Sequence, residues 1–388
     1  MSIAAIERTI PIAKTVMGEA EAEAAKRPIM SGWITQGPEV AAFEHEFAQY
    51  VGAAYACAVS NCTTALHLAL LAVGAQPGDE VITVSHSYIA TANSIHYCQA
   101  TPIFVDIDPA TQNINPALIE PAITPRTRAI LCVHQIGMPC DMPAILDIAR
   151  RYGLPVIEDA ACASGSELLY NGTWEHIGKP HGDIACFSFH PRKVISTGDG
   201  GMLTTNNPEY DRQFRLLRQH GMSVNDRVRH AAREVIFEEH ATIGFNYRMT
   251  DIQAAVGREQ LKRLPDIVAA RRRLAARYAE LLANIPGLQC PVEPGWAHTN
   301  WQSYSVWLPE WCDQRTVMQY LLDRGIASRR GIMCAHREAP YRKLARAAHL
   351  PESERAQDRT LILPLYPQLE LADQDYVVEV LREACAAR

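Results

Sequence analysis

The stretch CFSFHPRK (residues 186–193), which leads into GDGG (198–201), decides how this chain folds. An apolar strand runs into a loop bounded by glycines, and that loop carries one lysine, Lys193. In open α/β sheets, ligands bind at the carboxyl ends of the strands. We therefore expect Lys193 to reach a ligand from that edge of a sheet.

The rest of the chain alternates in the same way between short β-rich runs and helical stretches. Such alternation predicts an α/β fold with a mainly parallel sheet. Helical patterns follow at 252–261 and 265–285. The expected strands are 80–85, 102–107, 129–134, 154–159, 184–189 and 202–205.

A second strand ends in two carboxylates. The run VIEDAA (156–161) is apolar until Glu158 and Asp159. Two strand ends therefore offer an amine and a carboxylate. Pyridoxal phosphate (PLP) needs both, because a lysine forms its Schiff base and an anion keeps its pyridine nitrogen protonated. We expect PLP as the cofactor, with Lys193 and Asp159 as catalytic residues.

A third segment suits the phosphate of such a cofactor. Residues 56–60 predict a strand and 65–71 a helix, with NCTT (61–64) between them. The free N–H groups and the dipole at a helix N-terminus attract phosphate. The alternative is a plain helix cap by Ser60, Asn61 or Thr63. The segment alone favours the cap, but beside the amine and the carboxylate a phosphate site is the better interpretation.

Further ordered motifs resemble those of the DegT/DnrJ/EryC1/StrS aminotransferases, which use PLP and act mostly on keto sugars carried by nucleotides. They include GWITQGP (32–38), GFNYRM (244–249) and LPLYP (363–367), so the resemblance covers nearly the whole chain. It implies the PLP-dependent transferase fold of type I. We expect a large domain at 1–255, with a mostly parallel central sheet, and a smaller C-terminal α/β domain at 256–388.

The resemblance also implies roles for individual residues. Lys193 would form the internal aldimine, Asp159 would pair with the pyridine nitrogen, and Tyr88 would stack on the ring. The phosphate would be held by Thr63, Thr64, Ser188 and, from the neighbouring subunit, Asn246. That last match implies a homodimer with shared active sites, and the reaction would pass through pyridoxamine 5'-phosphate.

The sequence departs from the family pattern at two positions near the cofactor. Cys162 stands where many members have a glutamine close to the phenolic oxygen, and Ser164 follows it. A thiol is a weak hydrogen-bond donor. We therefore expect Cys162 to pack beside the ring without a strong hydrogen bond to that oxygen. Cys62 stands where a glycine is common in the phosphate turn.

Four residues are candidates for contacts with the substrate: Arg329, Arg330, His336 and His220. Guanidinium groups suit a pyrophosphate or a carboxylate. The alternatives are a solvated basic turn for the two arginines and a structural role for His220.

The resemblance implies transfer of an amino group from glutamate to a nucleotide-linked 3- or 4-keto sugar, in the biosynthesis of amino sugars for surface polysaccharides or natural products. Two alternatives remain open. The acceptor could be a non-sugar ketone or aldehyde, or the protein could be a PLP-binding regulator that turns nothing over.

Composition excludes other classes of partner. The chain has 388 residues and a formal net charge of −6, without a lysine/arginine block, so we expect neither nucleic acid nor membranes as partners. No signal-peptide core or membrane-length apolar run is apparent, and we expect a cytoplasmic protein. The 11 cysteines are scattered without metal-site spacing, so reduced thiols and no metal are expected. The expected partners are a small amino donor and a keto acceptor.

Overall fold

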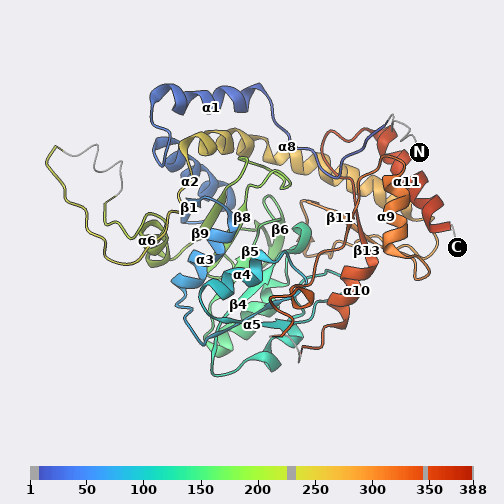
Figure 1. Cartoon of the computed structure of the whole chain (residues 1–388), viewed down its shortest axis with the longest axis horizontal. Helices are drawn as coiled ribbons and strands as arrows, with labels where there is room; N and C mark the ends of the chain where they lie inside the picture. The colour runs from blue at the N-terminus through green and yellow to red at the C-terminus, as the bar shows by residue number, and fades with distance from the viewer. Residues whose placement is uncertain (1–7, 225–232, 344–347, 387–388) are drawn as a thin grey trace.

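The computed structural model describes residues 8–224, 233–343 and 348–386. A seven-stranded sheet with the order β1-β9-β8-β5-β4-β2-β3 forms its centre (Figure 1). Strand β9 alone runs in the direction opposite to the other six, which confirms the expected, mainly parallel sheet. The strands are β1 (Tyr55–Val59), β2 (Glu80–Val84), β3 (Thr101–Val105), β4 (Thr127–Val133), β5 (Val156–Asp159), β8 (Ile184–Ser188) and β9 (Gly201–Thr205).

Helices surround this sheet, and α1, α2 and α8 lie side by side along its upper edge in Figure 1. The helices are α1 (Glu19–Ser31), α2 (Pro38–Val51), α3 (Cys62–Ala72), α4 (Ala90–Tyr97), α5 (Met142–Tyr152), α6 (Pro208–Leu217), α8 (Asp251–Leu282), α9 (Gln314–Leu322), α10 (Pro351–Arg359) and α11 (Leu371–Ala386).

Two small antiparallel sheets accompany the central one. The first has the order β10-β6-β7, and the second, with the order β11-β13-β12, belongs to the C-terminal part together with α9 and α11. Their strands are β6 (Glu167–Tyr170), β7 (Thr173–His176), β10 (Ala297–His298), β11 (Tyr304–Trp307), β12 (Arg329–Arg330) and β13 (Thr360–Leu363).

Helix α8 joins the two hydrophobic cores. The two helical stretches expected from the sequence form one continuous helix of 32 residues that contains Pro265. Leu264 packs in the core of the central sheet, whereas Leu274 and Tyr278 pack in the core of the C-terminal part. Ile10 lies in this second core as well. A single helix therefore fixes the C-terminal part relative to the central sheet.

Strand β8 is held by aromatic packing. Phe187 packs on Phe47 of α2 with ring centroids 5.0 Å apart, and Phe189 packs on Phe43 at 5.3 Å. Burial of each ring stabilises the fold by about 1.5–3 kcal/mol. Because side chains alternate along a strand, Ser188 points to the opposite side of β8 from these rings. The packing therefore fixes where the lysine loop begins.

No helix within the described ranges combines the length and apolarity needed to cross a bilayer. Likewise, the described part of the chain holds no group of three or more histidine, cysteine, aspartate or glutamate side chains arranged to bind a metal ion.

Candidate active site

The predicted catalytic residues meet at the carboxyl edge of the central sheet. Asp159 ends β5, and the loop after β8, its parallel neighbour, carries Lys193. The turn into α3 follows β1, and the loop with Tyr88 follows β2. Four segments far apart in the sequence thus reach one edge, where open α/β sheets bind ligands.

The loop that carries Lys193 is fixed at both ends. The Lys193 N–H donates to the His190 carbonyl at 2.8 Å, and the Thr197 N–H donates to Phe189 at 3.0 Å. Gly198 has φ +86°, a left-handed conformation that favours glycine. A side chain at Gly201 would lie 2.5 Å from the Asn61 backbone, so glycine there lets β9 pass against the start of α3.

Asp159 is a buried carboxylate, only 4% exposed. Its oxygens accept hydrogen bonds from the Thr91 hydroxyl at 2.8 Å and the Ala161 N–H at 3.2 Å. Burial raises the pKa of Asp159, although these bonds and the charge of Lys193 oppose the rise. A cation placed against this carboxylate would offset the cost of its burial. The pyridinium nitrogen of PLP is such a cation, so the site fits the cofactor here.

The Lys193 amine lies against a sulfur atom. Its Nζ donates a hydrogen bond to Cys162 Sγ at 3.1 Å. Burial lowers the pKa of Lys193, but Cys162, Cys62 and Asp159 together outweigh burial, and the net direction is upward. Cys162 therefore lies beside the lysine, and its packing against the cofactor ring stays a prediction.

The α3 turn combines a helix cap with a free donor. Asn61 is the cap, and its side chain accepts the Thr64 N–H at 3.0 Å; the Thr64 hydroxyl donates to the Asn61 carbonyl at 2.7 Å. The Thr63 N–H, in contrast, meets no acceptor within the described residues. Ser188 is buried, and its oxygen accepts the His190 N–H at 3.4 Å. The Thr63 amide and the Ser188 hydroxyl thus remain suited to a phosphate.

Two predicted cofactor residues are open to solvent. Tyr88 has 66% of its surface exposed, which leaves its ring free to stack on a planar group. Asn246 is exposed too, and within the described residues its side chain bonds only to Arg248, at 3.2 Å. Neither the hydrogen bonds nor the ion pairs of the described chain join Asn246 to Lys193 or Asp159.

The two arginines predicted to contact substrate differ in their electrostatic surroundings. Both are exposed on β12. Burial and the nearby charge of Arg192 lower the pKa of Arg329, and Arg192 immediately precedes Lys193. Arg330 instead pairs with Glu338 at 4.0 Å.

The two predicted histidines differ in their surroundings. Both ring nitrogens of His336 are engaged, Nδ1 with Ser85 at 2.6 Å and Nε2 with Glu354 at 3.0 Å. This anchors the segment around His336 to the end of β2. His220 is exposed with φ +63°, and no contact within the described residues connects it to Lys193.

Sequence reasoning missed two residues that support the site. Thr91 binds Asp159 from the first turn of α4, and its position soon after Tyr88 was a signal that could have found it. Asn300 is fully buried, and its Nδ2 donates to the carbonyls of Cys162 and Ser164, both at 2.8 Å. No local pattern links Asn300 to a turn so distant in sequence.

Solved structures of aminotransferases superimpose on the whole chain. The aminotransferase TlmJ from Streptoalloteichus hindustanus is 33% identical, with a TM-score of 0.90, over 98% of this chain and 100% of TlmJ. DesV from S. venezuelae, solved with a ketimine intermediate, is 34% identical with a TM-score of 0.87, over 98% of this chain and 99% of DesV. DesI, solved in the presence of its TDP-sugar product, is 29% identical with a TM-score of 0.89, over 98% of this chain and 94% of DesI.

The match to TlmJ over almost the full length confirms the PLP-dependent transferase fold of type I. Similar solved structures include the PLP and pyridoxamine phosphate forms of one sugar aminotransferase. The model of the DegT/DnrJ/EryC1/StrS aminotransferase family matches residues 15–382. The chain therefore belongs to the DegT/DnrJ/EryC1/StrS family and is a PLP-dependent aminotransferase.

Proposed function

We propose that this enzyme transfers an amino group from glutamate to the carbonyl carbon of a nucleotide-linked 3- or 4-keto sugar. The observation that carries the proposal is the placement of the Lys193 amine and the Asp159 carboxylate at the ends of the neighbouring strands β8 and β5. DesI, solved in the presence of its TDP-sugar product, supports a nucleotide sugar as the acceptor class. Amino sugars of this kind enter surface polysaccharides and natural products.

The residues that would hold PLP come from all four strand ends. Lys193 would bind it covalently, Asp159 would face its pyridine nitrogen, and Tyr88 would cover one face of its ring. The Thr63 amide and the Ser188 hydroxyl would receive the phosphate. When bound, PLP supplies an aldehyde carbon for attachment of amines and a ring that draws electrons from the bond being broken.

The protein's own contribution is to position charges and move a proton. Once an incoming amine has displaced the Lys193 amine, Nζ would act as a positioned base that takes a proton from the α-carbon of the amino donor. Its hydrogen bond to Cys162 Sγ holds Nζ at this edge of the sheet. Asp159, oriented by Thr91, keeps a negative charge where the ring nitrogen would lie.

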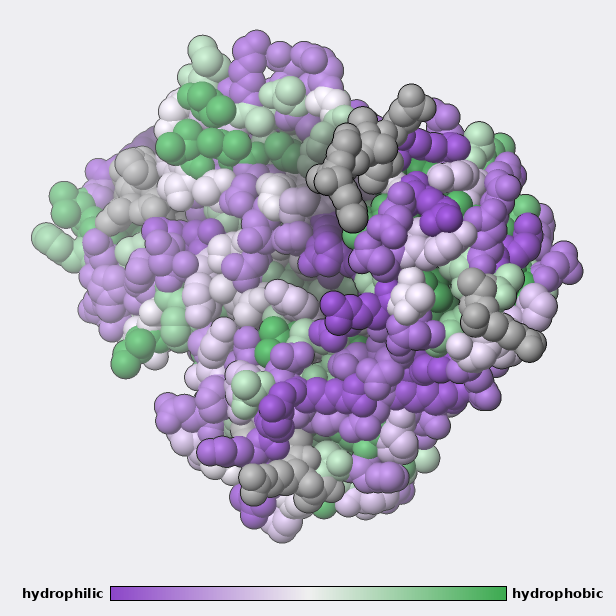
Figure 2. Space-filling view, turned by 45° about the vertical axis from the view of Figure 1, so that its right-hand side comes forward, coloured by the Kyte–Doolittle hydropathy of each residue, from purple (hydrophilic) through white to green (hydrophobic). Residues whose placement is uncertain are grey.

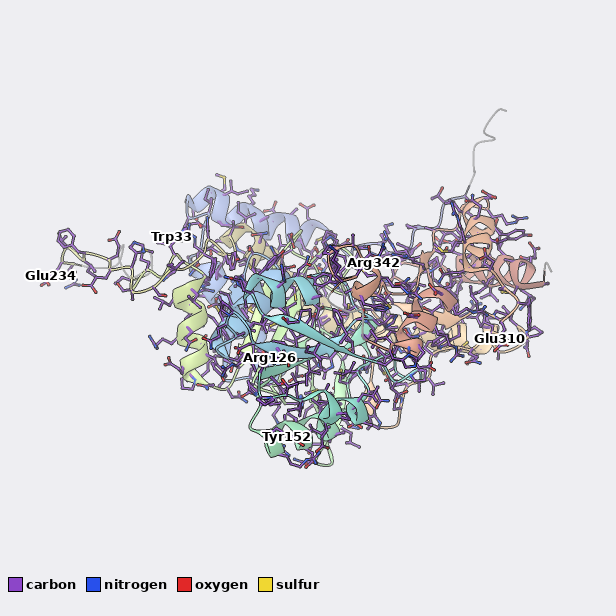
Figure 3. The ribbon with its side chains drawn as sticks, turned by 60° about the horizontal axis from the view of Figure 1, so that its bottom comes forward. Trp33, Arg126, Tyr152, Glu234, Glu310 and Arg342 are labelled. Atoms are coloured by element: carbon purple, nitrogen blue, oxygen red, sulfur yellow. The ribbon has the colours of Figure 1, made fainter. Side chains whose placement is uncertain are left out.

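We also propose that two chains share their active sites in a homodimer. The segment 219–246, called the arm here, is described except for 225–232 and projects from the body (Figure 1). Figure 3 shows Glu234 near its outer end, far from Arg126. Val235 and Phe237 on the arm are 82% and 87% exposed. Apolar side chains that find no cover on their own chain favour burial against another copy.

Asn246 lies at the base of the arm, where a partner's site could use it. Further apolar side chains are exposed at the end of α1, among them Ile29 and Met30. Figure 2 shows hydrophobic residues near the top of the molecule, beside hydrophilic ones. Burial of these side chains against a second copy would stabilise a dimer.

An acceptor other than a sugar is the second candidate. Cys162 and Ser164 depart from the glutamine-containing pattern of many sugar aminotransferases, and this observation favours a non-sugar ketone or aldehyde. The assignment as an aminotransferase removes the regulator hypothesis.

We also propose a cytoplasmic location, because all 11 cysteines are free thiols, as expected in a reducing compartment.

The test is the absorption spectrum of the purified protein with PLP, before and after addition of glutamate. The visible band of lysine-bound cofactor should bleach with glutamate and return when a nucleotide-linked keto sugar is added. Lys193→Ala serves as the control and should never form the band. A band that glutamate bleaches but only simple ketones or aldehydes restore would support the second candidate, and a band that no amino donor bleaches would contradict both.

A further inference from the structure

Cys162 and Lys193 form an amine–thiol pair at the opening of the active site. The Nζ–Sγ distance is 3.1 Å. Of the 11 cysteines, nine are buried, and only Cys162 and Cys290 are half-buried. An oxidant can reach a cysteine that is partly exposed, and Cys162 is one, with the Lys193 Nζ in hydrogen-bond contact with its sulfur.

We propose that a peroxide oxidises Cys162 and that the Lys193 amine then joins it, forming a reversible sulfur–nitrogen bond between Sγ and Nζ. This modification site goes beyond the proposed transamination, and the bond can form whether or not that proposal holds. It requires only that Nζ is not already bonded to a cofactor.

The chemistry balances in two steps. The Cys162 thiolate attacks hydrogen peroxide, the O–O bond breaks, and the sulfur, now oxidised by two electrons, carries the transferred OH group as sulfenic acid. The hydroxide that leaves takes up the proton released by the thiol and becomes water. The Lys193 amine then attacks this sulfur, the S–O bond breaks, and a second water leaves with a proton from Nζ. Condensation of a sulfenic acid with nitrogen is known for backbone amides, and an amine is the stronger nucleophile. A dithiol reverses the link by supplying two electrons and becoming a disulfide.

The structure holds both partners in place for this step. Asn300 donates two hydrogen bonds to the turn that carries Cys162, at the carbonyls of Cys162 and Ser164. The Lys193 backbone is fixed by its hydrogen bond to His190. A sulfenic acid formed on Cys162 therefore meets an amine within bonding reach rather than open solvent.

The competing partner is Cys62, which lies near the same amine. It is buried, and its Sγ contacts the Cys186 carbonyl at 3.7 Å. Burial raises the pKa of Cys62 well above its usual value, with smaller contributions from nearby Asp159 and cysteines. A thiol that stays protonated is a poor nucleophile. Oxidation of Cys162 to a neutral sulfenic acid removes the charge that does most to raise the pKa of Lys193, so burial then favours the neutral, nucleophilic amine of Lys193, whereas burial disfavours the reactive thiolate of Cys62.

Such a bond would make attachment of the cofactor to Lys193 depend on the redox state of Cys162. Lys193 is the residue expected to bind PLP, and a nitrogen bonded to sulfur cannot form that attachment. Chains that already carry cofactor on Lys193 would be protected, whereas cofactor-free chains would be stored in a form that a dithiol reactivates.

The experiment uses the full-length chain, freed of bound cofactor with hydroxylamine, reduced, desalted and then treated with hydrogen peroxide. Intact mass under non-reducing conditions should show the loss of two hydrogens, and digestion should yield a cross-linked peptide pair that contains Cys162 and Lys193. Dithiothreitol should restore both the mass and the capacity to form lysine-bound PLP.

Three variants make the result specific. Cys162→Ser should lose the cross-link, Cys290→Ser, which alters the other half-buried cysteine, should keep it, and Cys62→Ser should also keep it. A disulfide between Cys62 and Cys162 would produce the same mass loss. The inference would be overturned if the mass loss disappeared in Cys62→Ser. It would also be overturned if the peroxide-treated wild-type chain carried only added oxygen on Cys162 and no cross-link.

The outcome is separate from that of the proposed function. If the reduced chain fails to bind PLP through Lys193, the transaminase proposal falls while the mass result stands. If the chain binds PLP and bleaches with glutamate but shows no cross-link, only the redox inference falls.

Discussion

The Thr91 hydroxyl donates a 2.8 Å hydrogen bond to Oδ2 of Asp159, and the Ser87 hydroxyl donates in turn to Thr91, also at 2.8 Å. All three side chains are buried. A hydroxyl from α4 therefore sets the orientation of the carboxylate that ends β5. In this way the helix after the Tyr88 loop helps to orient the carboxylate proposed to face the cofactor.

Replacement of Thr91 by valine should weaken PLP binding. Valine keeps the shape but removes a hydrogen bond to a charged group, which contributes about 1.5–3 kcal/mol. The dissociation constant of PLP should therefore rise about ten- to a hundredfold, as measured by titration of the visible band. Ser87→Ala, one bond further from the carboxylate, is the matched control and should have a smaller effect. Equal effects of the two variants would argue against a direct role for Thr91.

Lys193→Ala should abolish turnover, because this change removes both the covalent attachment and the positioned base. Loss of a general base alone lowers rates by about 10²–10⁴-fold. The measurement is the rate of glutamate-dependent amination, with circular dichroism to verify folding. Lys262, an exposed lysine paired with Glu259, is the control, and Lys262→Ala should behave like wild type. Normal turnover of Lys193→Ala would contradict the assignment of the site.

Acid should destabilise the fold through Glu44. Burial raises the pKa of Glu44, but the Arg218 and Arg215 guanidinium groups outweigh burial and hold the pKa below its usual 4.5. Glu44 therefore stabilises the fold above about pH 4.5, and this contribution is lost as the pH falls through the lower pKa of the folded state. Urea unfolding at neutral and acid pH measures the effect.

The variant Glu44→Gln should lose about 3–5 kcal/mol at neutral pH, because Arg218 is left buried without its counter-charge. Its stability should also change less with pH in the acid range than that of wild type. Glu46→Gln breaks a pair with Arg258 nearer the surface and should cost only about 0–1 kcal/mol. Parallel pH profiles for Glu44→Gln and wild type would refute the role of Glu44.

Asn300→Ala should loosen the turn that carries Cys162. The change removes both donors to the Cys162 and Ser164 carbonyls and leaves those groups without their partner, at about 1–3 kcal/mol for each buried group. Chemical denaturation should show this loss of stability. Asn206→Ala removes a single, exposed hydrogen bond to Ala54 and should cost less. Equal stability of Asn300→Ala and Asn206→Ala would contradict the role of Asn300 in holding the Cys162 turn.

Mixed dimers test whether Asn246 acts across the subunit boundary. Lys193→Ala and Asn246→Ala should each be impaired alone, the second through poor cofactor retention. A mixture dissociated and reassembled should regain activity, because one site of each mixed dimer would then combine an intact lysine with an intact asparagine. No recovery is possible if Asn246 serves the site of its own chain. The readout is activity and bound PLP before and after mixing.

The lysine and aspartate could be predicted because each depends on local pattern. Apolar runs that end in polar residues identify strand ends, and parallel strands present those ends at one edge. The family resemblance then named Tyr88, Ser188 and the phosphate turn. The sequence left open whether Ser60, Asn61 or Thr63 caps α3. The structure shows that Asn61 does, because its side chain accepts the Thr64 N–H.

The sequence by itself determined the alternating α/β pattern and the cofactor class, and it predicted the pair Lys193 and Asp159, because periodicity and residue chemistry are local properties. Only the tertiary structure decided that α8 runs unbroken through both cores, that Asn300 holds the Cys162 turn, and that Cys162 lies 3.1 Å from the Lys193 amine. These contacts join residues far apart in the chain, and their geometry depends on how the whole core packs, which no local pattern encodes.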